Sequence, residues 1–531
     1  MASTQHASEE AFDFVIVGAG SAGSVLANRL SEDPSVRVLV LEAGPADTQE
    51  AIRIPALFST LFGSEVDWDY QIEPQSNYRG STQYPRGKTL GGSSSINLMV
   101  YIRGDRADFD RWSQQGCAGW DYDSVLPYFI KAENNSRLGR PLHGTAGPLH
   151  VEDRLFTHEL SRAWIDAAGK WGLPRTDDFN GTSQLGAGAY QVTCHAGWRW
   201  STADAYLRPA AERDNLVIRV DSQATRIRFA GKKATGVEYL RDGRPAFVRA
   251  DTEVVICGGA INSPQLLLLS GLGPADQLRT LGITVVAHLP AVGENLHDHA
   301  MVPLVWATQN SSDLLELASE QNMALWQGHG GGPFASNGAE VGAFLSADGS
   351  GIPDVQLIGG PTSFVDHGRT SPPLPNFTML VAGTHPQSRG RVWLRSSDPL
   401  AHPQIDPAYF SEPEDLRIIT AGLRAAVQIA EQGPFAKYAK GFNLPAEAPR
   451  DDAALSEHAR RWAQTEYHAA GTCAMGLGDR AVVDPDLKVH GVENLRVVDA
   501  SVMPSVISGN INAATIMIGE KAADKIKTQT R

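Results

Sequence analysis

The chain begins with apolar runs whose spacing predicts a strand, a helix and a second strand. Residues 12–17 (FDFVIV) form an apolar run with the length of a buried strand. Residues 21–33 (SAGSVLANRLSED) carry apolar positions at helical spacing, and residues 36–41 (VRVLVL) are a second apolar run. This order of elements is typical of a parallel α/β fold.

Shorter apolar runs predict three further strands and one helix, at residues 216–220, 224–229, 253–257 and 263–270. Pro264 falls in the first turn of that helix, where a missing backbone N–H is tolerated. Between 301 and 385, clusters of Gly, Pro and Ser separate short apolar segments, which predicts a substrate-binding layer of strands joined by long loops. Residues 513–527 are expected to form a helix with lysines near its end.

The composition is that of an ordinary globular protein. The chain has 531 residues, of which 42% are hydrophobic and 20% are charged, and its net charge is −14. Because this length exceeds one compact core, we expect two interleaved domains. The negative charge disfavours nucleic acid as a partner.

Three features of the sequence bear on its location. No apolar run approaches the ~18–20 residues of a transmembrane segment. Residues 1–14 lack the apolar core of a secretory signal. The four cysteines are scattered without metal-ligand spacing and fit a reducing compartment. We therefore expect a cytoplasmic protein, with peripheral membrane association left open.

A glycine-rich turn joins the first strand to the helix. Gly18, Gly20 and Gly23 follow the pattern G-x-G-x-x-G, which provides a tight turn, close approach of a pyrophosphate and packing of the helix on the strand. Glu42 closes the second strand, where an acceptor for a ribose hydroxyl belongs. The pattern predicts a dinucleotide cofactor and by itself leaves FAD and NAD open.

Two further segments carry a family resemblance. Residues 87–97 (GKTLGGSSSIN) concentrate small residues whose backbone can approach a ligand closely. Residues 259–273 (GAINSPQLLLLSGLG) predict a strand end, an N-capped helix and a glycine stop. Both segments match the signature patterns of the glucose–methanol–choline (GMC) family of flavoproteins, which the sequence resembles from Phe12 to about Ile526.

This resemblance implies an α/β fold, in which a Rossmann-like FAD-binding domain of the GMC type is joined to a substrate-binding domain built on an antiparallel sheet with helices. The expected divisions are an FAD-binding region at 10–305, a substrate-binding or cap region at 306–460, and a C-terminal return to the FAD domain at 461–531 that carries the catalytic pair. Residues 151–210 are expected to contribute to the substrate domain.

The resemblance also implies which residues contact FAD. At the ADP half these are Gly18, Gly20, Ser21, Ala22, Gly23, Glu42 and Ala43. Near the flavin and its ribityl chain they are Gly91, Ser94, Asn97, Leu98, Met99, Val100, Asp499, Ala500, Asn510 and Asn512. Some choline-oxidising relatives carry the flavin covalently on a histidine at the position of Ile96, so the isoleucine predicts noncovalent FAD.

A histidine and an asparagine near the end of the chain are the candidate catalytic pair. In the family, two side chains here face the flavin, and matching the motifs gives His468 and Asn512. An imidazole has an ordinary pKa of about 6.5 and can accept the hydroxyl proton of an alcohol. An amide N–H can stabilise the developing alkoxide. Asn510 lies in the same tract, so a shift by two residues would exchange the roles of the asparagines.

Other histidines and aromatic residues receive plainer interpretations. Five histidines in family-like stretches are interpreted as structural, namely His143, His150, His297, His299 and His385. His297 and His299 lack a placed third ligand, so no metal is expected. Some aromatic residues of the cap-like region are expected to line the pocket, from among Trp326, Phe334, Phe344 and Phe364.

The resemblance implies FAD-dependent oxidation of an alcohol to an aldehyde or ketone, by proton abstraction and hydride transfer to flavin N5. It is closest to the choline-dehydrogenase-like and L-sorbose-dehydrogenase-like branch, which favours a dehydrogenase with a quinone or dye-like acceptor. The first alternative is an oxidase that passes electrons to oxygen and makes hydrogen peroxide. A hydroxynitrile lyase with a structural FAD is a further alternative. No acidic or aromatic cage for a quaternary ammonium can be placed from the sequence, so choline itself is not favoured.

Overall fold

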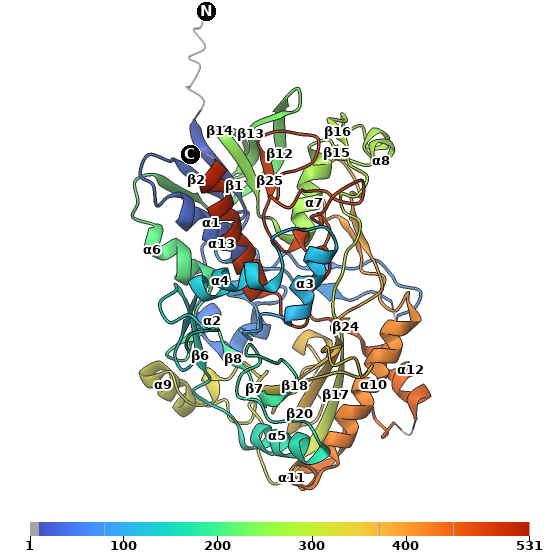
Figure 1. Ribbon diagram of the computed structural model, residues 1–531. Helices are drawn as coiled ribbons and strands as arrows, with labels where there is room; N and C mark the ends of the chain where they lie inside the picture. Colours follow the sequence, from blue (N-terminus) through green and yellow to red (C-terminus); the bar gives the residue numbers. More distant parts are fainter. Residues whose placement is uncertain (1–9, 79, 371, 450, 530–531) are drawn as a thin grey trace, which may run out of the picture.

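The computed structural model describes residues 10–78, 80–370, 372–449 and 451–529. Residues 1–9, on which the expectation about a secretory signal partly depends, lie outside the described residues, as do the last two of the segment 461–531. Figure 1 shows strands β1, β2 and β14 in the upper half of the molecule and strands β17, β18 and β20 in the lower half. The described residues build two seven-stranded sheets besides several smaller ones, and the α/β class expected from the sequence is observed.

The first sheet carries the glycine turn. Its strands are β1 Ala11–Val17, β2 Val38–Leu41, β11 Leu216–Arg219, β12 Ser222–Ala230, β13 Lys233–Arg241, β14 Arg244–Ile256 and β25 Leu495–Val497. They lie in the order β11-β2-β1-β14-β13-β12, and β25 also pairs with β14. The pairs around β1, β2 and β25 are parallel, whereas β12, β13 and β14 form an antiparallel meander. The strands predicted at the start of the chain and between 216 and 257 are confirmed.

Two helices from opposite ends of the chain pack together beside this sheet (Figure 1). They are α1 (Ser21–Leu30) and α13 (Asn512–Gln529), which confirms the predicted C-terminal helix. A Cβ atom on Gly519 would lie 3.0 Å from Cβ of Val25, so the glycine permits the close approach. Nη2 of Arg29 lies 2.7 Å from Oε1 of the buried Glu520. The end of the chain is thus fixed against the helix that follows the glycine turn.

Helix α7 (Gly259–Leu269) begins four residues earlier than the sequence predicted, so Pro264 lies inside it and not in its first turn. A proline at this position cannot donate to the carbonyl oxygen of Ala260, four residues earlier. The hydroxyl of Thr472 donates to that oxygen instead, at 2.6 Å. This side-chain bond satisfies the carbonyl that Pro264 leaves free and ties α7 to the segment that follows His468.

The second sheet is antiparallel throughout. Its strands are β7 Gly186–Ala189, β17 Ala300–Thr308, β18 Val341–Leu345, β19 Val355–Gly360, β20 Asn376–Gly383, β23 Ala439–Leu444 and β24 Gln464–Thr465. They lie in the order β23-β17-β20-β19-β18-β7, and β24 also pairs with β17. The strands predicted between 301 and 385 are confirmed, and a helix there, α9 (Glu320–His329), was not predicted.

The two faces of the second sheet pack against different partners. On β20, Met379 and Val381 belong to a buried cluster shared with helices α5 (Glu159–Trp171) and α10 (Pro413–Ala430). Leu380, between them, belongs to a different apolar cluster. Side chains of a strand alternate between the faces of its sheet. One face of the sheet therefore packs against α5 and α10, and the other face packs in a separate apolar cluster.

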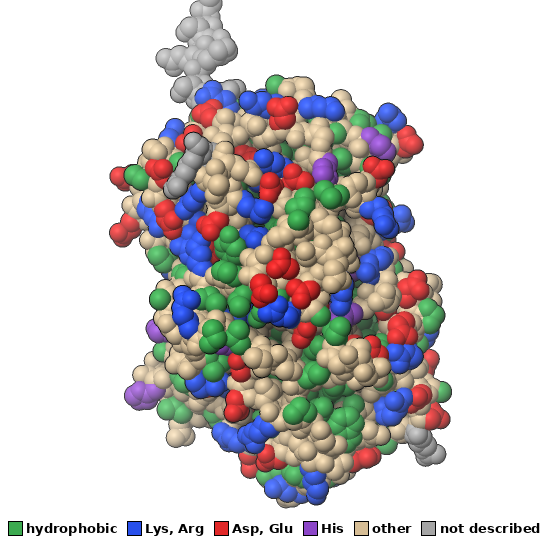
Figure 2. Space-filling model, in the orientation of Figure 1, with side chains coloured by type: hydrophobic (Ala, Val, Ile, Leu, Met, Phe, Trp, Pro, Cys, Tyr) green, Lys and Arg blue, Asp and Glu red, His purple; other side chains and the backbone are tan. Residues whose placement is uncertain are grey.

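The molecular surface mixes charges of both signs. Figure 2 shows acidic and basic side chains interspersed across the visible face.

Within the described ranges, the helices are all too short or too polar to cross a bilayer. The four cysteines are buried and free.

Candidate active site

The turn after β1 forms a narrow backbone cradle. Gly18 has a φ of +101°, and a Cβ atom there would lie 2.5 Å from the carbonyl oxygen of Cys257. A Cβ atom on Gly23 would lie 2.0 Å from the carbonyl oxygen of Gly18. Among the described residues no side-chain hydrogen bond caps the start of α1, so its first N–H groups are available to an anion. The cradle therefore fits a pyrophosphate.

Glu42 follows β2 at the edge of this cradle. Its carboxylate accepts hydrogen bonds from the N–H groups of Ala19 and Gly44, each at 2.9 Å. Burial raises the pKa of Glu42 to about 7. A carboxylate has about four lone-pair positions, so it can still accept a hydrogen bond from a ribose hydroxyl.

A single cavity connects the cradle to His468. The residues expected to contact FAD that line this cavity are Gly18, Gly20, Ser21, Ala22, Glu42, Ala43, Asn97, Leu98, Met99, Val100, Asp499, Ala500, Asn510 and Asn512. Gly23, Gly91 and Ser94 lie behind its wall in the described structure. Gly91 has a φ of +84°, and Oγ of Ser94 donates to its carbonyl oxygen at 2.6 Å. Gly23 therefore shapes the cradle, and Gly91 and Ser94 shape the loop formed by residues 87–97.

Asp499 joins α7 to the C-terminal segment at the cavity wall. Its Oδ2 accepts hydrogen bonds from the N–H of Gly259 at 2.8 Å and from the hydroxyl of Ser263 at 2.5 Å. Its Oδ1 accepts from the N–H of Ser501 at 2.8 Å. Two distant parts of the sequence are therefore held together where Asp499 and Ala500, which are expected to contact the cofactor, line the cavity.

The backbone around His468 is held by polar contacts on both sides. The N–H of His468 donates to Oδ1 of Asp298 at 2.8 Å. Tyr467 has a φ of +67°, in the left-handed region, and Arg86 donates to its carbonyl oxygen. The hydroxyl of Tyr467 lies 2.7 Å from Nδ1 of His367. These contacts fix the direction in which the imidazole of His468 points.

The structure places the two asparagines, left as alternatives by the sequence, against different partners. Nδ2 of Asn510 lies 3.2 Å from Nε2 of His468, whereas Oδ1 of Asn512 accepts a hydrogen bond from the hydroxyl of Ser21 at 2.6 Å. The physical reason is that α13 begins at Asn512, which turns that side chain toward the start of α1. Gln356 donates to Oδ1 of Asn510 at 3.1 Å, and this bond directs the amide N–H groups of Asn510 toward His468.

His299 contacts the other ring nitrogen of His468. The two Nδ1 atoms lie 2.9 Å apart, and Nε2 of His299 lies 3.0 Å from the carbonyl oxygen of Thr384. Burial lowers the pKa of His299 to about 4 and holds the pKa of His468 well below its ordinary value, so both rings are neutral near pH 7.

These contacts determine the tautomers of both rings. The carbonyl oxygen of Thr384 can only accept, so Nε2 of His299 carries the hydrogen and its Nδ1 is unprotonated. Nδ1 of His468 must then carry the hydrogen that it donates to His299. Nε2 of His468 is therefore unprotonated and accepts a hydrogen bond from Nδ2 of Asn510 at 3.2 Å.

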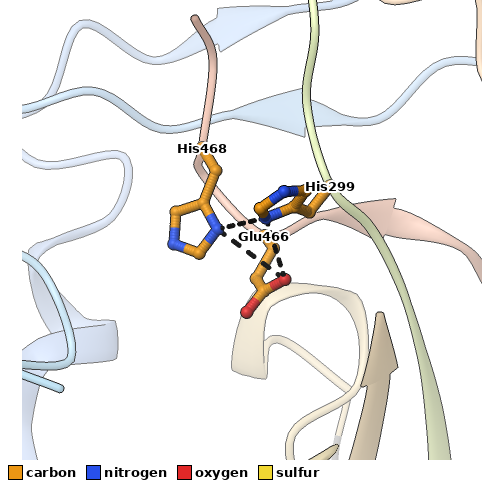
Figure 3. Close-up of side chains that lie close together, drawn as sticks. All are labelled: His299, Glu466 and His468. Atoms are coloured by element: carbon orange, nitrogen blue, oxygen red, sulfur yellow. Dashed lines mark hydrogen bonds and ion pairs between the residues drawn. The ribbon is translucent and has the colours of Figure 1, made fainter. Parts of the chain in front are cut away.

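Glu466 lies beside both imidazoles, as Figure 3 shows. Its Oε2 is 3.7 Å from Nδ1 of both His299 and His468, and neither carboxyl oxygen has a hydrogen-bond partner among the described residues. Burial raises the pKa of Glu466 well above its ordinary value, which favours the neutral acid.

The same three side chains are the candidates for holding a metal ion. The ligand atoms of His299, Glu466 and His468 lie within 4.8 Å of one another. A cation bound there would displace the hydrogen between the two imidazoles and lower the basicity of His468. The hydrogen bond between the rings accounts for their separation, so the absence of a metal stays our prediction.

Several residues of the site could not be found from sequence motifs. His299, interpreted as structural, contacts His468, and Glu466 was not considered. Of the aromatic residues proposed for the pocket, Phe364 lines the cavity. Trp326 and Phe334 pack in a separate apolar cluster, and Phe344 packs behind the wall. Apolar residues on the second sheet also line the cavity, at positions that carried no sequence signal, namely Met301, Ile358 and Leu380.

A dinucleotide cradle that opens onto a buried, unprotonated imidazole defines an oxidoreductase that works with a bound dinucleotide cofactor. The sequence matches the two family models described as GMC oxidoreductase, over residues 12–301 and 386–519. The chain belongs to the GMC oxidoreductase family, and it is an FAD-binding oxidoreductase that acts on CH–OH donors.

Relatives of known name align with nearly the whole chain. The mitochondrial choline dehydrogenase of Mus musculus is 43% identical over 98% of this chain and 90% of its own length. An alcohol dehydrogenase [acceptor] of Pseudomonas putida is 41% identical over 97% of this chain and 95% of its own length. The crystal structure of pyridoxine 4-oxidase from Mesorbium loti superposes with a TM-score of 0.89 at 33% identity, and the match covers 97% of this chain and 99% of that one.

Proposed function

We propose that the protein oxidises an alcohol to an aldehyde or ketone, with His468 as the base and Asn510 as the donor to the developing alkoxide. The observation that carries this proposal is the unprotonated Nε2 of His468, which accepts a hydrogen bond from Nδ2 of Asn510 at 3.2 Å inside the cavity that the cofactor cradle shares. The hydroxyl of a bound alcohol would replace this bond, donating to the imidazole and accepting from the amide.

Each residue then has a separate task. His468 takes the hydroxyl proton on Nε2 while its Nδ1–H remains bonded to His299. Asn510, held by Gln356, donates to the oxygen as negative charge develops there. FAD bound in the cradle supplies the acceptor for the hydride that leaves the carbinol carbon. Tyr467 and Asp298 keep the imidazole in place by fixing the backbone on either side of His468.

We propose further that the electrons pass to an acceptor other than oxygen, and that the protein works in the cytoplasm. The names of the relatives support a dehydrogenase, since they include two dehydrogenases that match over at least 97% of this chain. FAD is proposed to be held without a covalent bond, because Ile96 lines the cavity and offers no nucleophile to the flavin.

The test is the visible spectrum of the purified protein, recorded without air while alcohols are added. Loss of the flavin absorption band with any alcohol supports the proposed reaction, and slow recovery after oxygen is admitted supports a dehydrogenase. Rapid recovery would assign an oxidase. A band that no alcohol changes would overturn the proposal and favour the lyase alternative, which cyanohydrin cleavage would then examine. Acid precipitation that releases all the flavin would establish noncovalent binding.

A further inference from the structure

We propose that the alcohol this protein oxidises has an uncharged, apolar body, aliphatic or aromatic, and that neither a sugar nor a quaternary ammonium alcohol is its substrate. This inference rests on the proposed function, because it concerns the part of the cavity beside His468. It depends on which side chains form the walls there and on which polar groups remain free.

One wall is the second face of the antiparallel sheet. Met301 on β17, Ile358 on β19 and Leu380 on β20 line the cavity and belong to one apolar cluster. Gln356 lies two residues before Ile358, on the same face of β19, and it holds the amide of Asn510 at 3.1 Å. This apolar wall therefore begins directly beside the proposed site of the alkoxide.

The facing wall comes from loops and is also apolar. Phe62, Leu98 and Phe364 line the cavity and pack with the same cluster. The ring of Phe62 lies 5.3 Å from the ring of Tyr467, between centroids, and Tyr467 precedes His468 in the chain. The body of an alcohol bound at His468 is thus enclosed by aliphatic and aromatic side chains.

Three polar side chains line the cavity near these walls, namely Tyr467, Glu466 and Arg86. The hydroxyl of Tyr467 is bonded to His367, at 2.7 Å. The carboxyl oxygens of Glu466 are buried, and the raised pKa of this side chain favours the neutral acid. Arg86 donates to the backbone of Tyr467, and its Nη2 is buried. Besides His468 and Asn510, the carboxyl group of Glu466 and Nη2 of Arg86 are thus the polar groups here without a hydrogen-bond partner among the described residues. A neutral acid and a guanidinium offer no negative charge to a quaternary ammonium.

Burial of the substrate against these walls is expected to favour alcohols with longer apolar chains. Each buried methylene is worth about 0.8 kcal/mol, which corresponds to about a fourfold change in kcat/KM. A second hydroxyl or an ammonium group placed against these apolar walls would lose its hydrogen bonds to water and gain none from the side chains of the walls. From the cost of burying unpaired polar groups, we expect a loss of about 10- to 100-fold.

The experiment compares primary alcohols as reductants of the flavin without air. From 1-propanol to 1-hexanol, kcat/KM is expected to rise about fourfold per methylene until the cavity is filled. The matched pair is 1-hexanol and 5-amino-1-pentanol, which have similar size and differ in a terminal methyl or ammonium group. We expect 1-hexanol to be preferred at least about tenfold, and choline and glucose to be poorer still.

The possible failures are distinguishable. If no alcohol reduces the flavin, the proposed function fails. If alcohols reduce it but chain length has no effect, or if choline, glucose or the amino alcohol is preferred, the reaction stands and the apolar-substrate inference is overturned.

Two polar substitutions on neighbouring residues of β20 provide a matched control. Leu380→Asn places an amide on the cavity face, and Val381→Thr places a hydroxyl on the face that packs against α10. The first is expected to lower kcat/KM for 1-hexanol by about 10- to 100-fold while changing that for ethanol less. The second is expected to lower thermal stability and leave the dependence on chain length unchanged. Equal effects of both on chain-length dependence would contradict the inference, and the wild-type substrate series decides it if either variant fails to fold.

Discussion

Nδ1 of His468 lies 2.9 Å from Nδ1 of His299, although the two residues are 169 positions apart in the sequence. Because His299 is bonded to the carbonyl oxygen of Thr384 through its other nitrogen, it can only accept at Nδ1 while it is neutral. The proton on Nδ1 of His468 is therefore fixed. This contact leaves Nε2 unprotonated, as the proposed role of base requires.

The role of His299 predicts a difference between two substitutions. His299→Leu removes the acceptor and lets His468 adopt either tautomer, so flavin reduction should slow by about 10- to 100-fold with little change in KM. His299→Asn keeps an oxygen acceptor near the position of Nδ1 and should retain more of the rate. Stopped-flow reduction by 1-hexanol measures both. Equal losses in the two variants would show that His299 serves packing alone.

Removal of the base should stop the chemistry and leave the cofactor in place. His468→Ala is expected to slow flavin reduction by about 10²- to 10⁴-fold while the bound flavin content stays that of the wild type. The measurement is anaerobic reduction together with the flavin-to-protein absorbance ratio. His195→Ala, at an exposed position, is the control and should change neither quantity. An unchanged reduction rate in the His468 variant would remove this residue from the role of base.

Substitutions of the two asparagines should affect different measured quantities. Asn510→Ala is expected to slow flavin reduction by about 10²- to 10³-fold, because it removes the N–H donor to the alkoxide. Asn512→Ala should affect the rate less, since this side chain contacts Ser21 at the start of α1. Its effect should appear in the dissociation constant of FAD. The reverse ranking of reduction rates would return the assignment to Asn512.

The pH dependence follows from burial of the histidines. Because burial lowers the pKa of His468, the base stays neutral as the pH falls through its ordinary value, and flavin reduction should remain constant from pH 7 to below about 6.5. A histidine with a lowered pKa binds its proton more readily when unfolded, so the stability it contributes is complete above about pH 6.5. For His299 that stability is lost as the pH falls toward about 4.

Rate–pH profiles and unfolding midpoints at several pH values test both statements. His299→Asn lacks the titrating ring, so its unfolding midpoint should fall less steeply between pH 6.5 and 4 than that of the wild type. A reduction rate that already declines at pH 7 would show that His468 titrates near its ordinary pKa.

Glu466 gives a prediction about charge. If burial keeps its carboxyl group neutral, Glu466→Gln preserves both shape and charge and should leave flavin reduction within about threefold of the wild type. Glu466→Ala opens a space behind the imidazoles and should slow the reaction more. A large loss in the glutamine variant would instead show that an ionised carboxylate supports His468, and metal analysis of the same samples would detect a bound cation.

Local patterns in the sequence predicted the parts of the structure that depend on neighbouring residues. The pattern of Gly18, Gly20 and Gly23 predicted the position of the cradle. Such a turn requires residues without side chains at fixed positions within a six-residue segment. The apolar runs placed β1, β2, β11, β12 and β14 of the first sheet, and they predicted strands of the second sheet between 301 and 385 without their bounds. The first turn of α7 was misplaced, because the bond from Thr472 that compensates for Pro264 comes from a distant segment.

The remainder of the site depends on contacts that no local pattern carries. The contact of Asn510 with His468, and that of Asn512 with Ser21, depend on where α13 begins. The contact of His299 with His468 depends on the pairing of β17 with β24, which brings distant segments together. The apolar wall consists of single residues from separate strands, so each looked like ordinary core in the sequence.

The alternation of side chains along β20 assigns packing of the helices and lining of the cavity to different residues. Met379 and Val381 support the helices, while Leu380 between them borders the cavity. A substitution at Leu380 can thus change which alcohols fit without disturbing the residues on which the helices rest. A change of substrate preference in this fold can therefore begin at a single position on the cavity face, while the residues that contact the helices stay the same.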